Sequence, residues 1–566
     1  MSLRIPFDYE KKKQYSVRNM SVDKRMSIKP GTLIPIYFKK LYPGDKFDID
    51  VSTLLQSNPL ITPLMGEFVL RLSSFVQYDS NLYGWYDNNS KLSTNELLHK
   101  RRHFISGNNL PYYWKGETTA GAYNTVFRGS FFDFMGIPPL SGFPRYSGSS
   151  IDDKYRLCAD RVLTYLDIIR NYFVASQTIN IPYFEQTSSA SFALRYLSKD
   201  ELDRYFIWLR NQPDGVNIFD LTTVSSASNY FPGILSYFNS MKNGGLFSAQ
   251  YEPDMLRNIL LDIDSTKINV DVINNSFSID TLRFQNKLQR LVDRYDISGG
   301  RFSSWLKTVW GSSANRRLDI PQFVGTTSFI IDPNTVTSVA DTSSTPEQSN
   351  LGQLGGNINQ ANYRGKNSRN NTHHYVSVDE PATLCIVASL VPKVDYSQGL
   401  ERELRETIHS DDYKPEFSQL GFQDVPWSDY SLFPNLNADG QLVQITSGTA
   451  GTGTYLYEPD SVVGKQIAWM HLMSDLNRVH GEFAEDGYYS TWVLRRTFTK
   501  ITAYTDSEYR RPKTTEQSNN FYYVNPFDWY YPFEITDGTL DNFFLQVGLN
   551  IRAVRPIGKR FMPTLE

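Results

Sequence analysis

The sequence predicts a mainly β protein, built as one antiparallel β-sandwich whose connections have grown into subdomains. Segments with strand periodicity lie at both ends of the 566-residue chain, and segments with helical periodicity lie between them. Aromatic residues make up 14% of the chain, which favours strands and large contact surfaces. The 35 glycines and 28 prolines indicate frequent turns and long ordered loops.

The expected strands differ in the faces that they bury. Residues 45–54 alternate apolar and charged side chains, which predicts one buried and one solvated face. Residues 67–78 form a second candidate, and the unbroken apolar run 382–392 predicts a strand buried on both faces. In the last run, 543–556, one face carries Leu545, Val547, Leu549, Ile551 and Ala553, and the other carries Gln546, Asn550 and Arg552.

Helical periodicity is clearest over residues 152–173, where Asp152 or Asp153 can cap the first turn. Residues 199–211 and 280–296 also follow a helical pattern, 94–103 suggests a short helix, and 301–310 suggests an amphipathic one. The stripes expected on the helix over 152–173 are Cys158, Val162, Leu166, Ile169 and Phe173 on the apolar side, and Asp160, Thr164, Asp167 and Asn171 on the polar side.

Charge is unevenly distributed although the net charge is only −3. Residues 1–40 hold ten Lys or Arg against three acids, and the C-terminal segment adds Arg552, Arg555, Lys559 and Arg560. Basic ends on a near-neutral body predict contact with polyanions, and solvated charges without a partner are the alternative.

The number of cysteines and the lengths of the apolar runs indicate the cellular compartment in which the protein folds. The two cysteines, Cys158 and Cys385, exclude a disulfide framework and a thiolate-rich metal site. No run of eighteen apolar residues occurs, and the N-terminus lacks the apolar core of a signal peptide. We therefore expect a protein that folds in a reducing cytoplasm and does not insert into a membrane.

No reaction is indicated, and we predict no catalytic, cofactor-binding or metal-ligating residue. Phosphate loops, dinucleotide fingerprints and nucleophile elbows are all missing from the sequence. His99 and His103 have metal-ligand spacing, but three cations lie between them, so a basic surface turn is the better interpretation. His373 and His374 are interpreted as a solvated pair. Adjacent carboxylates suit a glycosidase poorly because neighbours in sequence point in different directions; they are Asp152–Asp153, Asp411–Asp412 and Glu485–Asp486.

Aromatic side chains are concentrated in residues 519–535, a short segment interrupted by prolines. Such a cluster either packs internally around a loop or anchors an interface, and near a basic face it could stack unpaired bases. The candidates for contact between subunits are Phe527, Trp529, Tyr530 and Tyr531.

Several stretches resemble the major capsid protein of the Microviridae, small icosahedral bacteriophages with single-stranded DNA. Residues 297–325 carry the clearest likeness: Gly299-Gly300-Arg301-Phe302 and the helix after it resemble the family's Gly-Gly-x-Arg-[Tyr/Phe] helix, and Arg-Leu-x-x-Pro-Gln-Phe-Val-Gly follows. Residues 165–178, 244–254 and 394–413 are similar to other segments of that family, in the expected order. Near the start, "GTLIPIYFKKLYPGDKFDID" resembles the opening strand and Pro-Gly-Asp turn of the family through Gly31, Pro35, Pro43, Gly44 and Asp45.

This resemblance implies a single jelly-roll β-barrel with long inserted loops and a few helices. It implies a T=1 shell of about 60 copies around circular single-stranded DNA, assembled in the bacterial cytoplasm. The partners implied are the chain itself, the DNA, a small basic internal DNA-binding protein, a minor or pilot protein and a bacterial surface receptor. No cofactor is expected, and structural Ca²⁺ is left open.

On this basis residues 1–30 form a basic arm and 31–566 one capsid domain, with insertions at about 80–150, 180–243, 325–375 and 435–460. We expect 325–375 to run over a neighbouring subunit and 180–243 to face the host. The DNA-facing candidates are Lys11, Lys12, Lys13, Arg552, Arg555 and Lys559. The alternative class is a carbohydrate-active jelly-roll enzyme or a carbohydrate-binding protein, which would require a cleft with two carboxylates or a secretion signal.

Overall fold

The fold is taken from a computed structural model of the chain. It describes residues 15–84, 100–114, 123–145, 156–174, 180–186, 192–219, 231–251, 320–331, 334–338, 353–357, 359–362, 373–408, 412–417, 421–430, 432, 445–446, 453–454, 462–484, 489–496, 522–534 and 540–557.

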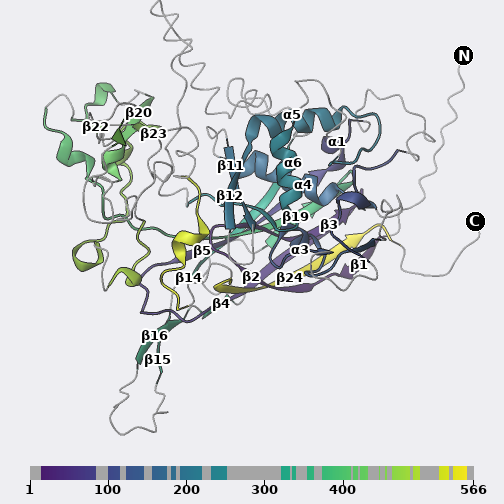
Figure 1. Ribbon diagram of the computed structural model, residues 1–566, viewed down its shortest axis with the longest axis horizontal. Helices are drawn as coiled ribbons and strands as arrows, with labels where there is room; N and C mark the ends of the chain where they lie inside the picture. The colour runs from purple at the N-terminus through teal and green to yellow at the C-terminus, as the bar shows by residue number, and fades with distance from the viewer. Residues whose placement is uncertain are drawn as a thin grey trace, which may run out of the picture.

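The architecture is mainly β and mainly antiparallel, as predicted (Figure 1). One large sheet, which we call the β24 sheet, has the last strand of the chain at its centre. Its strands are β1 (Ser16–Asn19), β2 (Val22–Ile28), β4 (Lys46–Ser57), β17 (Asn359–Asn362), β18 (His373–Ser377) and β24 (Phe543–Arg555). β1 and β2 follow each other along one side of β24, and β4 pairs with its other side.

A second sheet, which we call the β19 sheet, contains four strands in the order β14–β5–β19–β3. Every residue of β19 is buried, which confirms the prediction of a strand covered on both faces. The strands of this sheet are β3 (Leu33–Leu41), β5 (Phe68–Tyr78), β14 (Gln322–Ile331) and β19 (Ala382–Pro392).

Eight strands of the two sheets pair in a nested order. In chain order they are β2, β3, β4, β5, β14, β18, β19 and β24. The outermost strands of this order pair with each other, β2 with β24, and the pairs continue inwards: β3 with β19, β4 with β18 and β5 with β14. All four pairs are antiparallel. Successive pairs alternate between the β24 sheet and the β19 sheet, so the chain crosses repeatedly from one sheet to the other.

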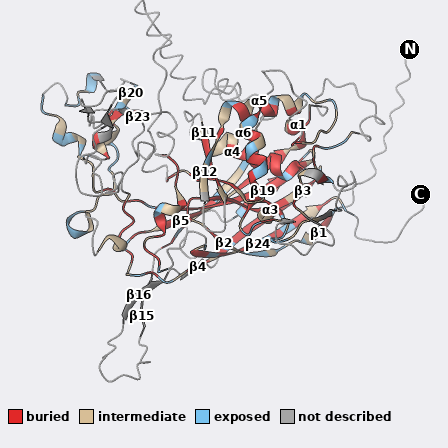
Figure 2. Cartoon of the chain, viewed as in Figure 1, coloured by how far each residue is buried: buried red, intermediate tan, exposed pale blue. Residues whose placement is uncertain are grey.

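The two sheets pack against each other through a shared apolar core. Phe68 of β5 and Phe543 of β24 meet edge to face, with ring centroids 5.1 Å apart. Alternate residues of β24 are buried, and those between them are mostly exposed or intermediate, as its sequence pattern predicts. Figure 2 shows the buried residues concentrated in these sheets and in the helix beside them.

Helices cover the outer face of the β19 sheet (Figure 1). Tyr165 of the central helix, α4, donates a hydrogen bond to the Leu33 carbonyl at 2.7 Å, and Tyr172 donates one to the Pro321 carbonyl at 2.5 Å. Because β3 and β14 are the two edges of this sheet, α4 crosses all four strands. The helices are α1 (Asp79–Leu82), α3 (Phe131–Met135), α4 (Asp160–Tyr172), α5 (Lys199–Arg210) and α6 (Pro232–Ser240).

The helix predicted over 152–173 begins later than expected. Residues Arg156–Cys158 form a short strand, β10, that pairs with β6 (Phe104–Ser106), and the helix starts at Asp160. Its expected polar stripe is also buried at Asp160, Thr164 and Asp167, because α4 is enclosed between the sheet and the other helices. The helix at 199–211 is confirmed as α5, residues 100–103 are not helical, and 280–296 and 301–310 lie outside the described residues.

Smaller elements complete the helical side of the molecule. β11 (Asn180–Gln186), β12 (Phe192–Ser198) and β13 (Gly244–Phe247) form a three-stranded sheet next to α5 and α6. β7 (Tyr112–Trp114) pairs with β8 (Tyr123–Asn124) and, in parallel, with β9 (Phe143–Arg145). η2 (Gly107–Asn109) is a single 3₁₀ turn.

A separate lobe extends to one side of the sheets (Figure 1). It is built on the pair β20 (Phe422–Pro426) and β23 (Val462–Ile467), with few buried residues around it (Figure 2). Two further hairpins are β15 (Asn334–Ser338) with β16 (Gln353–Asn357) and β21 (Ile445–Thr446) with β22 (Gly453–Thr454). The 3₁₀ turns of the lobe and of the C-terminal third are η6 (Arg402–Arg405), η7 (Pro415–Phe417), η8 (Trp427–Asp429), η9 (Met470–Leu472), η10 (Gly481–Ala484), η11 (Ser490–Trp492) and η12 (Pro526–Trp529).

Candidate assembly surfaces and a polar pocket

The Pro-Gly-Asp turn between β3 and β4 holds the end of the last strand. Gly44 has a φ of 91°, a conformation that favours glycine, and the turn places the fully buried Asp45 carboxylate beside β24. Asp45 Oδ2 accepts a hydrogen bond from the Tyr42 N–H at 2.8 Å. Arg555 donates to both oxygens of Asp45, from Nε at 3.1 Å and from Nη2 at 2.8 Å.

The DNA-facing candidates fall in different environments. Arg555 is 9% exposed and has Asp45 and the Lys40 carbonyl as partners, so its guanidinium is bound within the chain. Arg552 is exposed on β24, opposite Asp48 of β4. Lys11, Lys12, Lys13 and Lys559 lie outside the described residues.

Three of the four aromatic candidates for subunit contact face the inside of the chain. Trp529 and Tyr530 are buried, and the Trp529 ring lies 6.3 Å from that of Tyr251. The half-buried Tyr531 donates a hydrogen bond to the Val493 carbonyl at 2.6 Å. The segment was predicted either to pack internally or to anchor an interface. Internal packing describes Trp529, Tyr530 and Tyr531, whereas Phe527 lines a pocket.

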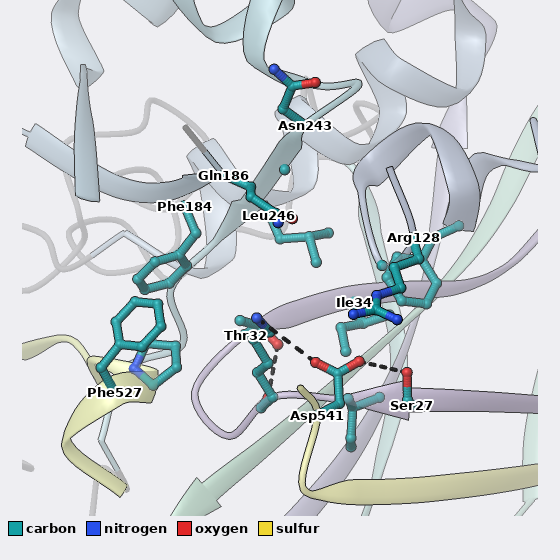
Figure 3. Close-up of a pocket in the computed structure, with 16 residues that line it drawn as sticks. Ser27, Thr32, Ile34, Arg128, Phe184, Gln186, Asn243, Leu246, Phe527 and Asp541 are labelled. Atoms are coloured by element: carbon teal, nitrogen blue, oxygen red, sulfur yellow. Dashed lines mark hydrogen bonds and ion pairs between the residues drawn. The ribbon is translucent and has the colours of Figure 1, made fainter. Parts of the chain in front are cut away.

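Phe527 closes one end of a pocket of about 50 Å³ between the sheets, α3 and η12 (Figure 3). Its ring lies at 6.1 Å from the Phe184 ring of β11, nearly perpendicular to it. This end of the pocket is apolar because the two rings meet there, and Leu246 lies between them and Ile34, which is next to Arg128 (Figure 3).

The opposite end of the pocket is charged. The Asp541 carboxylate accepts a hydrogen bond from the Ser27 hydroxyl at 2.5 Å and lies 3.8 Å from the Lys29 ammonium (Figure 3). Arg128 points into the same space from the turn before α3, and within the described residues its guanidinium has no ion-pair partner. The pocket therefore combines an apolar wall with one carboxylate and two cations.

A buried charge cluster joins the helices to the β19 sheet. The Lys40 ammonium of β3 lies 2.6 Å from Asp79 of α1 and 3.3 Å from Asp160 of α4. The Arg102 guanidinium contacts the same two carboxylates, at 3.3 and 2.7 Å. Burial opposes ionisation of Asp160, but Lys40, the Tyr83 hydroxyl and Arg102 together hold its pKa below the usual value.

His374 and His103 are buried, although both were predicted to lie at the surface. His374 was interpreted as part of a solvated pair, but it is 2% exposed and lies between the sheets. Its Nδ1 is 2.6 Å from the Ser74 hydroxyl and its Nε2 is 3.0 Å from the Thr327 hydroxyl, so it bridges β18 to β5 and β14. His373 is exposed, as expected.

His103 is also buried rather than part of a surface turn, with 1% exposure. Its Nδ1 accepts a hydrogen bond from the Val216 N–H at 3.2 Å, and its ring stacks on that of Tyr83. Burial lowers the pKa of His103 to about 4, so the ring is neutral at physiological pH. Its partner in the sequence pattern, His99, lies outside the described residues.

The described residues offer no support for chemistry at a metal or at paired carboxylates. No group of three or more His, Cys, Asp or Glu is arranged to hold a metal ion in this part of the chain. Burial raises the pKa of the Cys158 thiol, so it is not an activated nucleophile. Of the three adjacent acid pairs, only Asp412 is described, and it is exposed.

Comparison with known proteins relates part of the chain to one family. Residues 214–477, a little under half of the chain, match the model of the family described as capsid protein (F protein). Over these residues the chain is similar to a family of viral capsid proteins. No protein in the curated set matches the chain.

The matched part includes some strands of each sheet and most of the lobe. It contains β14 and β19 of the β19 sheet and β18 of the β24 sheet, together with η6, β20, β23 and η9 of the lobe. A match to a capsid family is consistent with self-assembly into a shell and a place in the virion. Among the described helices, none has the length and apolar character needed to cross a membrane.

Sequence reasoning missed the contacts that hold this protein together. Asp45 was noticed as part of a turn motif, but its partner is Arg555, at the other end of the chain. Asp160 was placed on a polar stripe of the helix, but it is buried and its partners Lys40 and Arg102 come from distant segments. Lys29, Arg128 and Asp541 carried no sequence signal, since three distant loops bring them to the pocket.

Proposed function

We propose that this protein is the major capsid protein of a small icosahedral bacteriophage, forming a T=1 shell of about 60 copies around circular single-stranded DNA. The observation that carries the proposal is the nested pairing of eight strands, which alternates between two facing sheets. This nested order supports a jelly roll, in which a folded ribbon of four antiparallel pairs wraps into two sheets. Jelly rolls are common in viral capsids, and the family match is to a capsid protein.

The DNA in this proposal contacts the basic ends of the chain. Lys11, Lys12 and Lys13 precede β1, and Lys559 follows β24, so both ends enter the structure on the same sheet. Phosphate neutralisation by such arms is independent of sequence and sensitive to salt. Arg552 is exposed nearby, whereas the bonds of Arg555 to Asp45 favour a structural role.

The remaining parts of the proposal concern the surface. Parts of insertions such as 180–243 contribute to host attachment. Of the segment 325–375, the hairpin β15–β16 reaches a neighbouring subunit, since β14, β17 and β18 belong to the sheets of their own chain. The small basic DNA-binding protein, the pilot protein and the bacterial receptor are further partners that the resemblance suggests. A carbohydrate-active enzyme is not favoured, because the buried carboxylates Asp79 and Asp160 are neutralised by Lys40 and Arg102.

Electron microscopy of the purified protein and of particles formed in the presence of single-stranded DNA tests the proposal. Closed particles of uniform diameter with icosahedral symmetry are the expected result. A protein that sediments as a monomer at all concentrations, with or without DNA, would contradict it. Hydrolysis of a polysaccharide by that monomer would favour the enzyme class.

A further inference from the structure

The lobe has an acidic surface. We define it as the described residues in 401–430 and 462–484. Its half-buried arginines are occupied within the chain: Arg405 pairs with Asp429, and Arg478 donates to the Gly399 carbonyl at 2.7 Å. All described Lys and Arg side chains of the lobe are only partly exposed, and its fully exposed charged residues are acidic: Glu401, Glu403, Asp412, Glu416, Asp424, Asp475 and Glu482.

Large apolar side chains lie exposed on the same lobe. Leu404 is 66% exposed, Met473 63% and Leu472 49%. A carboxylate oxygen of Glu406, the residue after η6, lies 3.2 Å from His471 Nε2 of η9, so these two turns, which carry the exposed side chains, lie close together. A surface that is both apolar and acidic calls for a partner that is apolar and cationic, since contiguous exposed apolar side chains mark interaction sites.

The helical layer has the opposite character. Among the described residues 100–251, Asp200 is the one exposed carboxylate; Arg102 already pairs with Asp79 and Asp160, and Arg195 with Glu185. The exposed arginines there are Arg101, Arg102, Arg128, Arg156, Arg161, Arg195 and Arg204. Arg204 and Ile207 lie one turn apart on the outer side of α5, and Ile207 is 62% exposed. The Arg101 N–H donates to Asp214 at 2.7 Å, which holds its segment beside the loop that follows α5.

We propose that the acidic lobe of one copy docks on the arginine-rich face of the helical layer of a second copy. The proposal rests on the shell function and names one of its contacts. Arginine guanidinium groups can bind the lobe carboxylates with two hydrogen bonds each, while Leu404, Leu472 and Met473 pack against Ile207. Because lobe and helical layer are different parts of the chain (Figure 1), the contact is heterologous, and its repetition closes a ring.

Nucleic acid is the competing partner for the arginine face. Seven arginines would suit phosphates, but the lobe would repel a polyanion and would then lack a partner. A single contact between copies accounts for both surfaces, including their apolar side chains. Nucleic-acid binding by the arginine face is therefore treated as an outcome that the experiment can detect.

Substitutions that reverse the charge of each surface, separately and together, test the contact. One variant carries Glu403→Arg and Asp475→Arg, a second carries Arg101→Glu and Arg204→Glu, and a third combines all four substitutions. All four positions have partly or fully exposed side chains, so the fold is expected to persist, and the thermal unfolding midpoint checks it. A control matched to the arginine variant, Lys24→Glu with Arg25→Glu on β2, makes the same change of charge as that variant at another exposed site.

Self-association is measured by sedimentation velocity at several protein concentrations, and particles are imaged by electron microscopy. Each two-residue variant of the contact should lower the association constant about tenfold or more, and the four-residue variant should restore it to within about threefold of the original. Association that is unchanged in both variants, or not restored by their combination, would overturn the proposal. Loss of DNA content without loss of association in the arginine variant would also overturn it, in favour of nucleic acid. An original protein that does not associate at all would instead refute the shell function.

Discussion

The guanidinium of Arg555 forms two hydrogen bonds with the carboxylate of Asp45, which lies 510 positions earlier in the chain. The carboxylate is fully buried, and the arginine is 9% exposed. The pair fastens the end of the central strand β24 to the turn between β3 and β4. Removing one partner would leave the other charge buried without compensation.

Replacing Arg555 with Leu should therefore lower the free energy of unfolding by about 3–5 kcal/mol. Chemical denaturation of the unassembled chain measures the change. The exposed pair Lys393–Glu67, 3.0 Å long, provides a control, and Glu67→Ala should cost under about 1 kcal/mol. Equal losses in the two variants would show that burial of the Asp45 pair does not matter.

The buried histidines should make the protein less stable in mild acid. Burial lowers the pKa of His374, and it lowers that of His103 to about 4, whereas an unfolded histidine titrates near pH 6.5. Between these values the unfolded chain binds more protons than the folded chain, so stability falls as the pH decreases from about 6.5 towards 4. His103 alone would contribute a loss of about 3 kcal/mol by pH 4.

Unfolding curves recorded from pH 8 to pH 4 check this dependence. Substituting His103 with Gln removes the titrating group, so the decline below pH 6.5 should become shallower, even though the variant is less stable at pH 8. Substituting the exposed His480 with Gln is the control, and it should leave the slope as it was. A parallel slope in the His103 variant would assign the acid sensitivity to other groups.

Gly31 occupies a turn that no other residue fits. Its φ is 75°, and a Cβ atom at this position would lie 2.3 Å from Val524 Cγ1. Gly31→Ala should destabilise the fold by more than the roughly 1–2 kcal/mol expected from backbone strain alone. Gly481→Ala has a similar φ of 68° with nothing within 4 Å, so it isolates the strain. Thermal unfolding midpoints that fall equally in both variants would contradict a steric role for Val524.

The aromatic segment should separate into a structural part and a surface part. Trp529 is 1% exposed, so Trp529→Ala should lower stability by about 3–5 kcal/mol. Phe527 borders the pocket and is only half-buried, so Phe527→Ala should cost less. Denaturant midpoints of the two variants provide the comparison, and a larger loss at Phe527 would reverse the assignment.

Neutralising Lys11, Lys12 and Lys13 to Gln should lower the DNA retained per particle without changing the unfolding midpoint of the chain. The reason is that phosphate neutralisation by these cations is electrostatic and non-specific, so retention should also become less sensitive to salt. The ratio of absorbance at 260 to 280 nm of purified particles, measured over a salt series, gives the readout. Unchanged retention would place the arm away from the genome.

The extent to which the sequence predicted the structure depended on the range of the interactions. Period-two patterns located β4, β5, β19 and β24, because alternation follows directly from which face is buried. The start of α4 was misplaced, because Arg156–Cys158 pairs with Phe104–Ser106 of β6, a partner that local periodicity cannot reveal.

Buried polar groups were the main failure of prediction for the candidate sites. His374, Asp160 and Arg555 all look like surface residues in a linear reading, since polar side chains are usually exposed. Each is buried because a partner arrives from a distant segment: Thr327 for His374, Lys40 for Asp160 and Asp45 for Arg555. The family resemblance identified the class of protein, but it carried no information about these pairs.

The central position of β24 has a consequence for synthesis in the cell. This strand lies between β2 and β4, yet it follows all the other described strands in the sequence and is synthesised after them. Until it is released, β1 and β2 have no neighbour to join, and Asp45 has no countercharge. A chain that terminated before β24 would lack the strand that joins β1 and β2 to β4. Only copies that contain β24 would therefore be incorporated into a growing particle.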